Sequence, residues 1–299
     1  MERDENYFFI INPVAGVGKG LKVWKKIKPI LEKLKIKFEY MLTEYPGHAT
    51  EIAKNAIKQG FKYIISVGGD GTTREIATGF NNNDVVLGII PAGRGRDLPR
   101  SLSIPKSPFK ALELILNNGN IIEIDHPKFD DTRFLNFSGI GLDAEVAYVA
   151  NKKFRYLGFL SYLIGLFYVL YYWKLPEFKL KIDGEIKKVK AYLITIANGK
   201  FGGGGMQISP LSDIKDGFLD IIIFHKMPKL RFLYHFPKVY FGGGHIRVNG
   251  VESLKGKRVE IDANENIKTQ ADGDLFGGLP KYYEIDGKKI KVICGFDVK

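Results

Sequence analysis

The sequence is poor in the residues that build disulfides and most transition-metal sites. Its 299 residues include one cysteine, Cys294, which excludes an internal disulfide and a cysteine-based zinc site. The histidines are few and scattered, and none forms a pair at the spacing of metal ligands. We therefore interpret them as surface or core side chains; they lie at positions 48, 126, 225, 235 and 245.

The sequence also lacks a secretion signal. The first residues, MERDEN, are charged and run directly into the apolar YFFII, without a basic start or a cleavage site. We therefore expect a cytoplasmic protein. The stretch from Leu157 to Trp173 carries no charge, but it falls short of the roughly 20 apolar residues that a membrane-spanning helix needs. It predicts a helix that is either buried in the protein or placed in a membrane interface, flanked by basic residues.

The charge balance favours anionic partners. Lys and Arg number 45 against 33 Asp and Glu, giving a formal net charge of +12. Such a surface suits nucleotides, nucleic acid or an anionic membrane. The chain has no basic helix and no stacking-aromatic pattern, so we expect no nucleic-acid partner. The 34 glycines gather in short runs, which indicates sites shaped by the backbone.

The apolar patterning predicts an α/β domain followed by a mostly β domain. Up to about residue 124, short apolar runs alternate with helical patterns, as in a parallel sheet covered by helices. From residue 125 to 299, short alternating segments separated by turn pairs such as Asp183-Gly184 indicate antiparallel β-structure. The expected strands of this second domain are Phe134 to Phe137, Phe178 to Ile182, Ala191 to Ala197, Phe218 to Phe224, Arg258 to Ile261, Tyr282 to Ile285 and Lys291 to Ile293.

Glycine-rich turns follow the strands of the first domain, where ligands of such sheets collect. The run from Asn12 to Gly20 resembles a phosphate-binding loop, but Pro13 and Gly20 stand where that motif needs Gly and Ser or Thr. The run Gly68-Gly69-Asp70-Gly71-Thr72 is more informative. Its glycines allow close approach to phosphate, and the helix after it presents its positive end. An acid in such a turn indicates work through Mg²⁺ or a proton, which points to Asp70.

The Gly68–Thr72 turn, preceded by a strand that ends in Asn-Pro, resembles the lipid-kinase family that contains diacylglycerol and sphingosine kinases. Further motifs of that family match in order from residue 12 to about 280, so the resemblance covers nearly the whole chain. They are the loop from Pro91 to Arg100, the segment from Phe134 to Ala144, Asn198-Gly199 with Gly202 to Gly205, the segment from Asp216 to Asp220, and Asp272-Gly273-Asp274.

The resemblance implies a soluble kinase of the bacterial diacylglycerol kinase type. It implies a phosphofructokinase-like nucleotide domain (1–124) and an antiparallel β-sandwich lipid domain (125–299), with catalysis in a cleft between them. The substrates would be ATP and a membrane lipid hydroxyl, with Mg²⁺ as cofactor and an anionic membrane as the peripheral docking surface. The nucleotide site would comprise Asn12, Thr43, Gly69, Asp70, Gly71, Thr72 and Glu75; the essential acids would be Asp70, Asp97, Asp216 and Asp274, with Asp213 and Asp216 at a structural Mg²⁺.

Two positions depart from the family pattern. Arg94 and Arg96 stand where Thr and Asn are usual, and they could add positive charge toward phosphate or an acidic head group. Asp274 replaces a Glu, so its carboxylate is one methylene shorter. It could still accept a hydroxyl proton if the substrate lies closer, and Asp70 is the other candidate for that role. Mg²⁺ bridging the β- and γ-phosphates near Asp70 completes the hypothesis.

Other functions remain open at this point. An NAD kinase also carries a GGDG turn, but it typically continues with an Asn-Glu pair, and Asn264-Glu265 is a lone match in a polar loop. A non-catalytic basic protein would need neither Asp70 nor Asp216. A catalytically weak relative that binds lipid or nucleotide would be consistent with Asp274. The lipid itself and a homodimeric state are not decided by the sequence.

Overall fold

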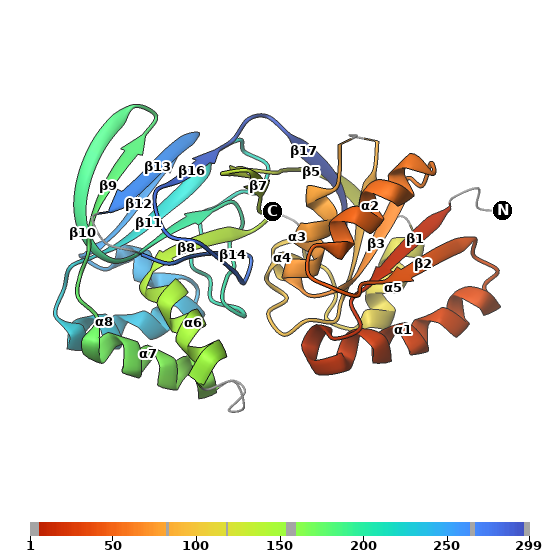
Figure 1. Cartoon of the computed structure of the whole chain (residues 1–299), viewed down its shortest axis with the longest axis horizontal. Helices are drawn as coiled ribbons and strands as arrows, with labels where there is room; N and C mark the ends of the chain where they lie inside the picture. The colour runs from red at the N-terminus through yellow and green to blue at the C-terminus, as the bar shows by residue number, and fades with distance from the viewer. Residues whose placement is uncertain (1–5, 82–83, 118, 154–159, 264–266, 296–299) are drawn as a thin grey trace. The chain divides into compact units, whose positions relative to one another are not determined.

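The computed structural model describes residues 6–81, 84–117, 119–153, 160–263 and 267–295 (Figure 1). The chain divides into two compact units, which are described here one at a time. Unit 1 consists of Met1–His126, Gly203–Gly205 and Lys288–Lys299, and unit 2 consists of Pro127–Gly202 and Met206–Gly287.

Unit 1 is a six-stranded sheet with the strand order β2-β1-β3-β4-β17-β5. All neighbours are parallel except β17 and β5, which are antiparallel. The elements are β1 (Tyr7–Ile11), α1 (Ala15–Lys33), β2 (Phe38–Leu42), α2 (His48–Lys58), β3 (Tyr63–Gly68), α3 (Asp70–Thr78), β4 (Val86–Pro91), α4 (Asp97–Ser101), α5 (Pro108–Leu116), β5 (Asn120–Asp125) and β17 (Lys289–Cys294).

Helices cover both faces of this sheet, which explains the apolar runs of its central strands. Every residue of β1 and β4 is buried, as expected for parallel strands that pack on two sides. The helices contact one another as the pairs α2–α3 and α1–α5 (Figure 1). The predicted α/β class of the first part is therefore confirmed.

The last strand corrects the sequence analysis. Lys291 to Ile293 was expected among the antiparallel segments of the second domain, but β17 pairs with β4 and β5 of unit 1. Its alternating pattern is the same whichever sheet it joins, so periodicity cannot assign it. In sequence, unit 2 is thus inserted between β5 and β17. That unit 1 binds nucleotide and unit 2 binds lipid remains a proposal.

Unit 2 is built on two antiparallel sheets that share β10. One half of β10 pairs with β9 and the other half with β8 and β11, and the register shifts between Ala191 and Leu193. Its strands are β6 (Lys128–Phe129), β7 (Thr132–Arg133), β8 (Phe137–Gly141), β9 (Glu177–Ile182), β10 (Glu185–Ala197), β11 (Leu219–His225), β12 (Val251–Gly256), β13 (Arg258–Ala263), β14 (Thr269–Ala271), β15 (Asp274–Phe276) and β16 (Lys281–Glu284).

Two apolar cores lie on opposite faces of the sheet that contains β11. Ile221 and Ile223 belong to a core with strands of the other sheet, whereas Ile222 and Phe224 belong to a core with helices. Alternate side chains of a strand point to opposite faces, so a strand covered on both faces is apolar throughout. The helical elements of unit 2 are α6 (Leu142–Lys153), α7 (Leu160–Tyr172), α8 (Lys229–His235) and the 3-10 helices η2 (Phe236–Tyr240) and η3 (Gly244–Arg247).

Helix α7 (Leu160–Tyr172) lies within the apolar stretch from Leu157 to Trp173 for which a helix was expected. Residues 154–159 lie outside the described residues. Leu166, Val169 and Leu170 pack into the helical core of unit 2. Among the described residues, no helix is both long enough and apolar enough to cross a membrane. The helix therefore has a packed side, as the buried-helix interpretation expected.

We expect the substitution Ile194→Ala to lower the free energy of unfolding by about 2–5 kcal/mol, the usual cost of emptying a buried aliphatic site. Ile194 is fully buried between the two sheets of unit 2. Ile186→Ala on the same strand is the control, because Ile186 is 63% exposed and its truncation should cost within about 0.5 kcal/mol. Denaturant unfolding measures both, and equal losses would contradict the packing described.

Candidate functional site

Three loops of unit 1 are in backbone contact beyond the carboxyl ends of β1, β3 and β4. A Cβ atom on Gly16 would lie 2.3 Å from the carbonyl oxygen of Ala92, and one on Gly93 would lie 2.5 Å from the Cα of Gly69. Any larger side chain would collide with main chain that cannot move aside. Glycine is therefore required at both positions, and the three loops form one continuous backbone surface.

Asn12 links the first of these loops to the second. Its side-chain nitrogen donates to Oγ1 of Thr72 at 2.9 Å, and its Oδ1 accepts the backbone N–H groups of Val14 and Ala15, each at 3.1 Å. The Asn12 amide thus binds the backbone of its own loop through Oδ1 and the neighbouring loop through its nitrogen. The predicted nucleotide residues Asn12 and Thr72 are brought together.

The Gly68–Thr72 turn leads directly into α3. Gly69 has extended backbone and precedes the helix, Asp70 is its first residue, and Thr72 lies in its first turn. The first amides of a helix have no partner within it and point outward together with the positive end of its dipole. Gly69, Gly71 and Thr72 therefore form an arrangement able to bind an anion, as predicted for a phosphate turn.

Asp70 points toward the third loop of the site. Its Oδ1 accepts the backbone N–H of Leu98 at 3.1 Å, at the start of α4. Burial raises the pKa of Asp70 above its ordinary value, and backbone N–H groups of residues 96–98 partly oppose that rise. Asp70 is thus a buried acid whose ionised form is held by main chain.

Asp97 is the second acid of this site. Its Oδ1 accepts a hydrogen bond from the guanidinium group of Arg100 at 3.1 Å, and its Oδ2 accepts the backbone N–H of Gly204 at 2.8 Å. Burial, and then repulsion from Asp70, raise the pKa of Asp97 to about 6. A Cβ atom on Gly95 would lie 2.9 Å from Oδ2 of Asp70 and 3.2 Å from Oδ2 of Asp97, so both carboxylates reach the same glycine.

The other predicted nucleotide residues lie on the same unit. Thr43 directly follows β2, and its backbone N–H donates to the carbonyl of Ile11 at 2.8 Å, which places it next to the end of β1. Glu75 lies one turn into α3, with a half-buried side chain, and its carbonyl accepts the hydroxyl of Thr50 at 2.8 Å. Whether Thr43 and Glu75 bind nucleotide stays a prediction.

The predicted metal ligands lie in the loop before β11 of unit 2. Oδ1 of Asp213 accepts the N–H of Lys215 at 3.1 Å, and Oδ1 of Asp216 accepts the N–H of Phe218 at 3.0 Å. Lys255 lies 2.5 Å from Oδ2 of Asp216. Across the part of the chain that the structure describes, no group of three or more His, Cys, Asp or Glu residues is arranged to hold a metal ion.

The donor chemistry of this loop nevertheless suits Mg²⁺. That ion prefers oxygen ligands and is commonly held by one or two carboxylates together with water. Lys255 also lies 3.9 Å from Oδ1 of Asp220, whose pKa is raised by burial. Asp213 and Asp216 of the loop and Asp220 at the start of β11 thus gather three carboxyl groups, and Lys255 supplies one positive charge to them.

Asp274 is the first residue of β15, in the hairpin formed with β14. The structure thus brings Asp70 and Asp97 together in unit 1, and places Asp213, Asp216 and Asp274 in unit 2. Sequence reasoning noted the glycines at 202–205 but missed that Gly204 binds Asp97. Only the run of small residues could have signalled a close backbone contact.

Two family models match the chain. One, described as the diacylglycerol kinase catalytic domain, matches residues 6–128, and the other, described as the YegS C-terminal NAD kinase beta sandwich-like domain, matches residues 137–294. A Bacillus subtilis (strain 168) protein named "Putative lipid kinase YtlR" is 31% identical, over 92% of this chain and 95% of that protein. The chain belongs to the diacylglycerol kinase catalytic-domain family.

Other members of this family agree in extent and fold. The "Diacylglycerol kinase" of Bacillus subtilis (strain 168) is 30% identical, over 91% of this chain and 90% of that protein. A solved structure titled as a putative diacylglycerol kinase from Bacillus anthracis str. Sterne superposes with a TM-score of 0.81 at 26% identity, covering 99% of this chain and 97% of the other. The catalytic-domain model spans both Asp70 and Asp97, and the second model spans Asp213, Asp216 and Asp274.

We expect Asp97→Asn to become more stable relative to the parent as the pH rises from about 4 to 7, with little further change above pH 7. The folded state binds the Asp97 proton more tightly than the unfolded chain does, so the contribution of Asp97 to stability is greatest below pH about 4 and falls as the pH rises through about 6. The shift corresponds to a change on the order of 2–3 kcal/mol. Thermal unfolding of both proteins at several pH values measures it. A constant gap between them would contradict the raised pKa.

Proposed function

We propose that this chain is a lipid kinase that transfers the γ-phosphate of ATP to a hydroxyl of a membrane lipid, with diacylglycerol as the first candidate. Kinase chemistry follows from the family. The names of the relatives, "Diacylglycerol kinase" and "Putative lipid kinase YtlR", support a lipid acceptor. The observation that carries the proposal is the contact of three glycine loops around Asp70 and Asp97 in unit 1.

The nucleotide would bind through main chain more than through side chains. The amides at Gly69, Gly71 and Thr72 begin α3, where an anionic phosphate is favoured by the helix dipole and by N–H groups without helical partners. Asn12 holds Thr72 in place by the 2.9 Å hydrogen bond described above. Phosphoryl transfer requires mainly positioning and stabilisation of charge, and such a rigid backbone surface suits both needs.

The acids would manage the proton and the charge of the reaction. The lipid hydroxyl oxygen forms a bond to the γ-phosphorus while the bond to the β–γ bridging oxygen breaks, and ADP leaves. The hydroxyl proton passes to a carboxylate, for which we propose Asp274, with Asp70 as the alternative. Asp70 keeps its geometry through the N–H of Leu98, and Asp97 keeps its own through Arg100 and Gly204.

We propose Asp213 and Asp216 as the residues that would hold Mg²⁺ in unit 2. A metal bound there would supply positive charge that neutralises the acidic loop and fixes its shape. Lys255 would share the Asp216 carboxylate with that ion, because its ammonium group already contacts Asp216 at 2.5 Å. The role proposed for this loop and its metal is therefore structural, with no contact to the reacting atoms.

We expect Asp70→Asn to reduce transfer by at least about a hundredfold while the protein stays folded, because an amide cannot replace an ionised carboxylate in charge stabilisation. Asp84→Asn is the matched control, since Asp84 has a side chain that is 76% exposed and lies before β4 in the same unit. Labelled ATP and a total lipid extract serve as substrates, and the labelled lipid is identified. Full turnover by Asp70→Asn would refute the assignment.

The rival activity is an NAD kinase, and the description of the second family model mentions that fold. The same assay separates the two, because NAD replaces the lipid extract in a parallel reaction. We expect label in lipid and none in NADP. Label in NADP alone would show that the protein is an NAD kinase and would refute the proposed lipid kinase activity.

The lipid would be reached from a membrane surface, and α7 provides a face suited to it. The side of α7 opposite its packed residues is apolar and exposed; Phe167 is 54% exposed and Tyr171 is 88% exposed. Basic groups border this face: Lys153 donates to the hydroxyl of Tyr168 at 2.6 Å, and Lys229 donates to the carbonyl of Tyr171 at 3.0 Å. Aromatic side chains beside lysines favour an anionic bilayer interface.

We expect the double substitution Phe167→Ser/Tyr171→Ser to lower binding to vesicles of phosphatidylcholine and phosphatidylglycerol by at least tenfold, without loss of thermal stability. Ile186→Ser is the control, because Ile186 is comparably exposed but lies on β10. Vesicle sedimentation at low and high salt measures binding. Unchanged binding, together with a change from dimer to monomer in gel filtration, would instead make this face a contact between copies of the chain.

A further inference from the structure

The hairpin that carries Asp274 is closed by a tight two-residue turn. Strands β14 and β15 pair with Ala271 opposite Asp274, which leaves Asp272 and Gly273 as the two turn residues. Both have positive φ, 47° at Asp272 and 91° at Gly273. This is the backbone of the turn that matches the twist of a two-residue hairpin, and Asp and Gly are the residues that tolerate it.

The Asp272 side chain binds a segment remote in sequence. Its Oδ2 accepts the backbone N–H of Leu135 at 2.7 Å, and its Oδ1 accepts those of Asn136 at 2.9 Å and Phe137 at 3.1 Å. Asp272 is only 7% exposed. A carboxylate shielded from water and bonded to three successive N–H groups forms strong, geometrically restrictive contacts.

These contacts fix the hairpin relative to β8. Ala271 pairs with Ser138 in the β14–β8 ladder, and the backbone N–H of Asp272 donates to the carbonyl of Phe137 at 3.0 Å. Within the described chain, β15 has β14 as its only paired strand, so it lies at the edge of the sheet. The position of Asp274 relative to the sheet therefore depends on the β14 ladder and on the Asp272 anchor.

A second contact restrains the turn itself. Oε1 of Gln270 accepts the backbone N–H of Gly273 at 3.1 Å, and the carbonyl of Gln270 accepts the hydroxyl of Ser138 at 2.7 Å. Asn136, one of the residues bound by Asp272, accepts on its carbonyl the N–H groups of Asn198 and Gly199. The turn is thus tied into the loops of unit 2 that carry family motifs.

We propose that Asp272 is a positioning residue for the reaction and holds the carboxylate of Asp274 in its productive place without touching substrate. The inference rests on the proposed role of Asp274 as proton acceptor. Asp274 is one methylene shorter than the Glu usual in the family, so it has less reach with which to compensate for a displaced backbone. A displacement of about 1 Å at a reacting group costs about a hundredfold in rate.

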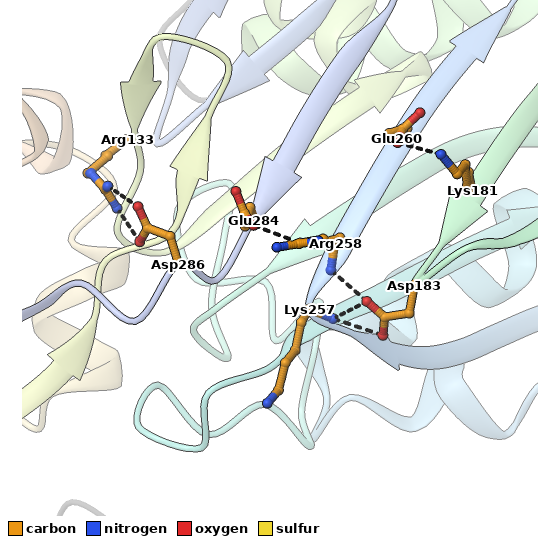
Figure 2. Close-up of polar contacts among 8 residues, drawn as sticks. All are labelled: Arg133, Lys181, Asp183, Lys257, Arg258, Glu260, Glu284 and Asp286. Carbon is orange, nitrogen blue, oxygen red and sulfur yellow. Dashed lines mark hydrogen bonds and ion pairs between the residues drawn. The ribbon is translucent and has the colours of Figure 1, made fainter.

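The chain contains a matched control for this anchor. Asp183-Gly184 forms the two-residue turn between β9 and β10, with φ of 49° and 98°. Figure 2 shows the Asp183 carboxylate accepting the backbone N–H groups of Lys257 and Arg258, at 3.0 and 2.8 Å. Asp183 therefore forms the same kind of turn and also binds backbone N–H groups of a remote segment, although its side chain is exposed, in a hairpin that carries no proposed catalytic residue.

The experiment compares Asp272→Asn with Asp183→Asn. An amide of the same size loses one acceptor oxygen, so hydrogen exchange should rise at the amides of residues 135–137 in the first variant and of 257–258 in the second. The loss of thermal stability should be larger for Asp272→Asn, because Asp272 is buried and Asp183 is exposed. Only Asp272→Asn should lower kcat for lipid phosphorylation, by at least about tenfold, with the KM for ATP unchanged. Asp183→Asn should keep kcat within about twofold of the parent.

The outcomes separate this inference from the proposed function. If the parent is active, Asp274→Asn is inactive and Asp272→Asn matches Asp183→Asn in kcat, the positioning role is overturned while the function stands. If Asp274→Asn keeps full activity, the proposed role of Asp274 fails and the inference fails with it. Unchanged hydrogen exchange at residues 135–137 in Asp272→Asn would overturn the anchor regardless of any activity.

Discussion

Carboxylates that accept backbone N–H groups from another loop hold the functional parts of this protein in place. Asp70 binds the start of α4, Asp97 binds Gly204, and Asp272 binds the segment before β8. A buried charge is costly unless hydrogen bonds compensate it, so each of these acids permits few positions of the loop it binds. The loops lack regular secondary structure, and these contacts supply the order that a ladder of strand hydrogen bonds would otherwise give.

The hydrogen bonds of Asp70 and Asp97 hold loops in place and also shift the pKa values of the two carboxyl groups. Burial raises the pKa of both acids, and repulsion from Asp70 raises that of Asp97 further, yet backbone N–H groups bound to each carboxylate favour its ionised form. Arg100 and the amide of Gly204 offset part of the repulsion at Asp97. An approaching cation would favour the ionised form of Asp97, and an approaching anion its protonated form.

Much of the fold and part of the site could be predicted because their signals are local. The run in β3 followed by Gly68 to Thr72 shows strand, turn and helix within a few residues, and the four apolar residues Ile221 to Phe224 of β11 indicate a strand covered on both faces. The remaining features depend on partners far along the chain. A segment expected as a strand from Phe134 begins its ladder only at Phe137, because Asp272 takes the N–H groups before it. Likewise, no local pattern connects Gly204 with Asp97.

The return of β17 to the first sheet has a consequence for how the protein assembles on the ribosome. Among the described strands, β17 (residues 289–294) is the one that lies between β4 and β5, and it is synthesised after all of unit 2. Until then the sheet of β2, β1, β3 and β4 ends in an unpaired edge at β4, and β5 has no strand of this sheet to pair with. The inserted unit can form its own ladders before that closure, so the domain that starts first is the one that finishes last.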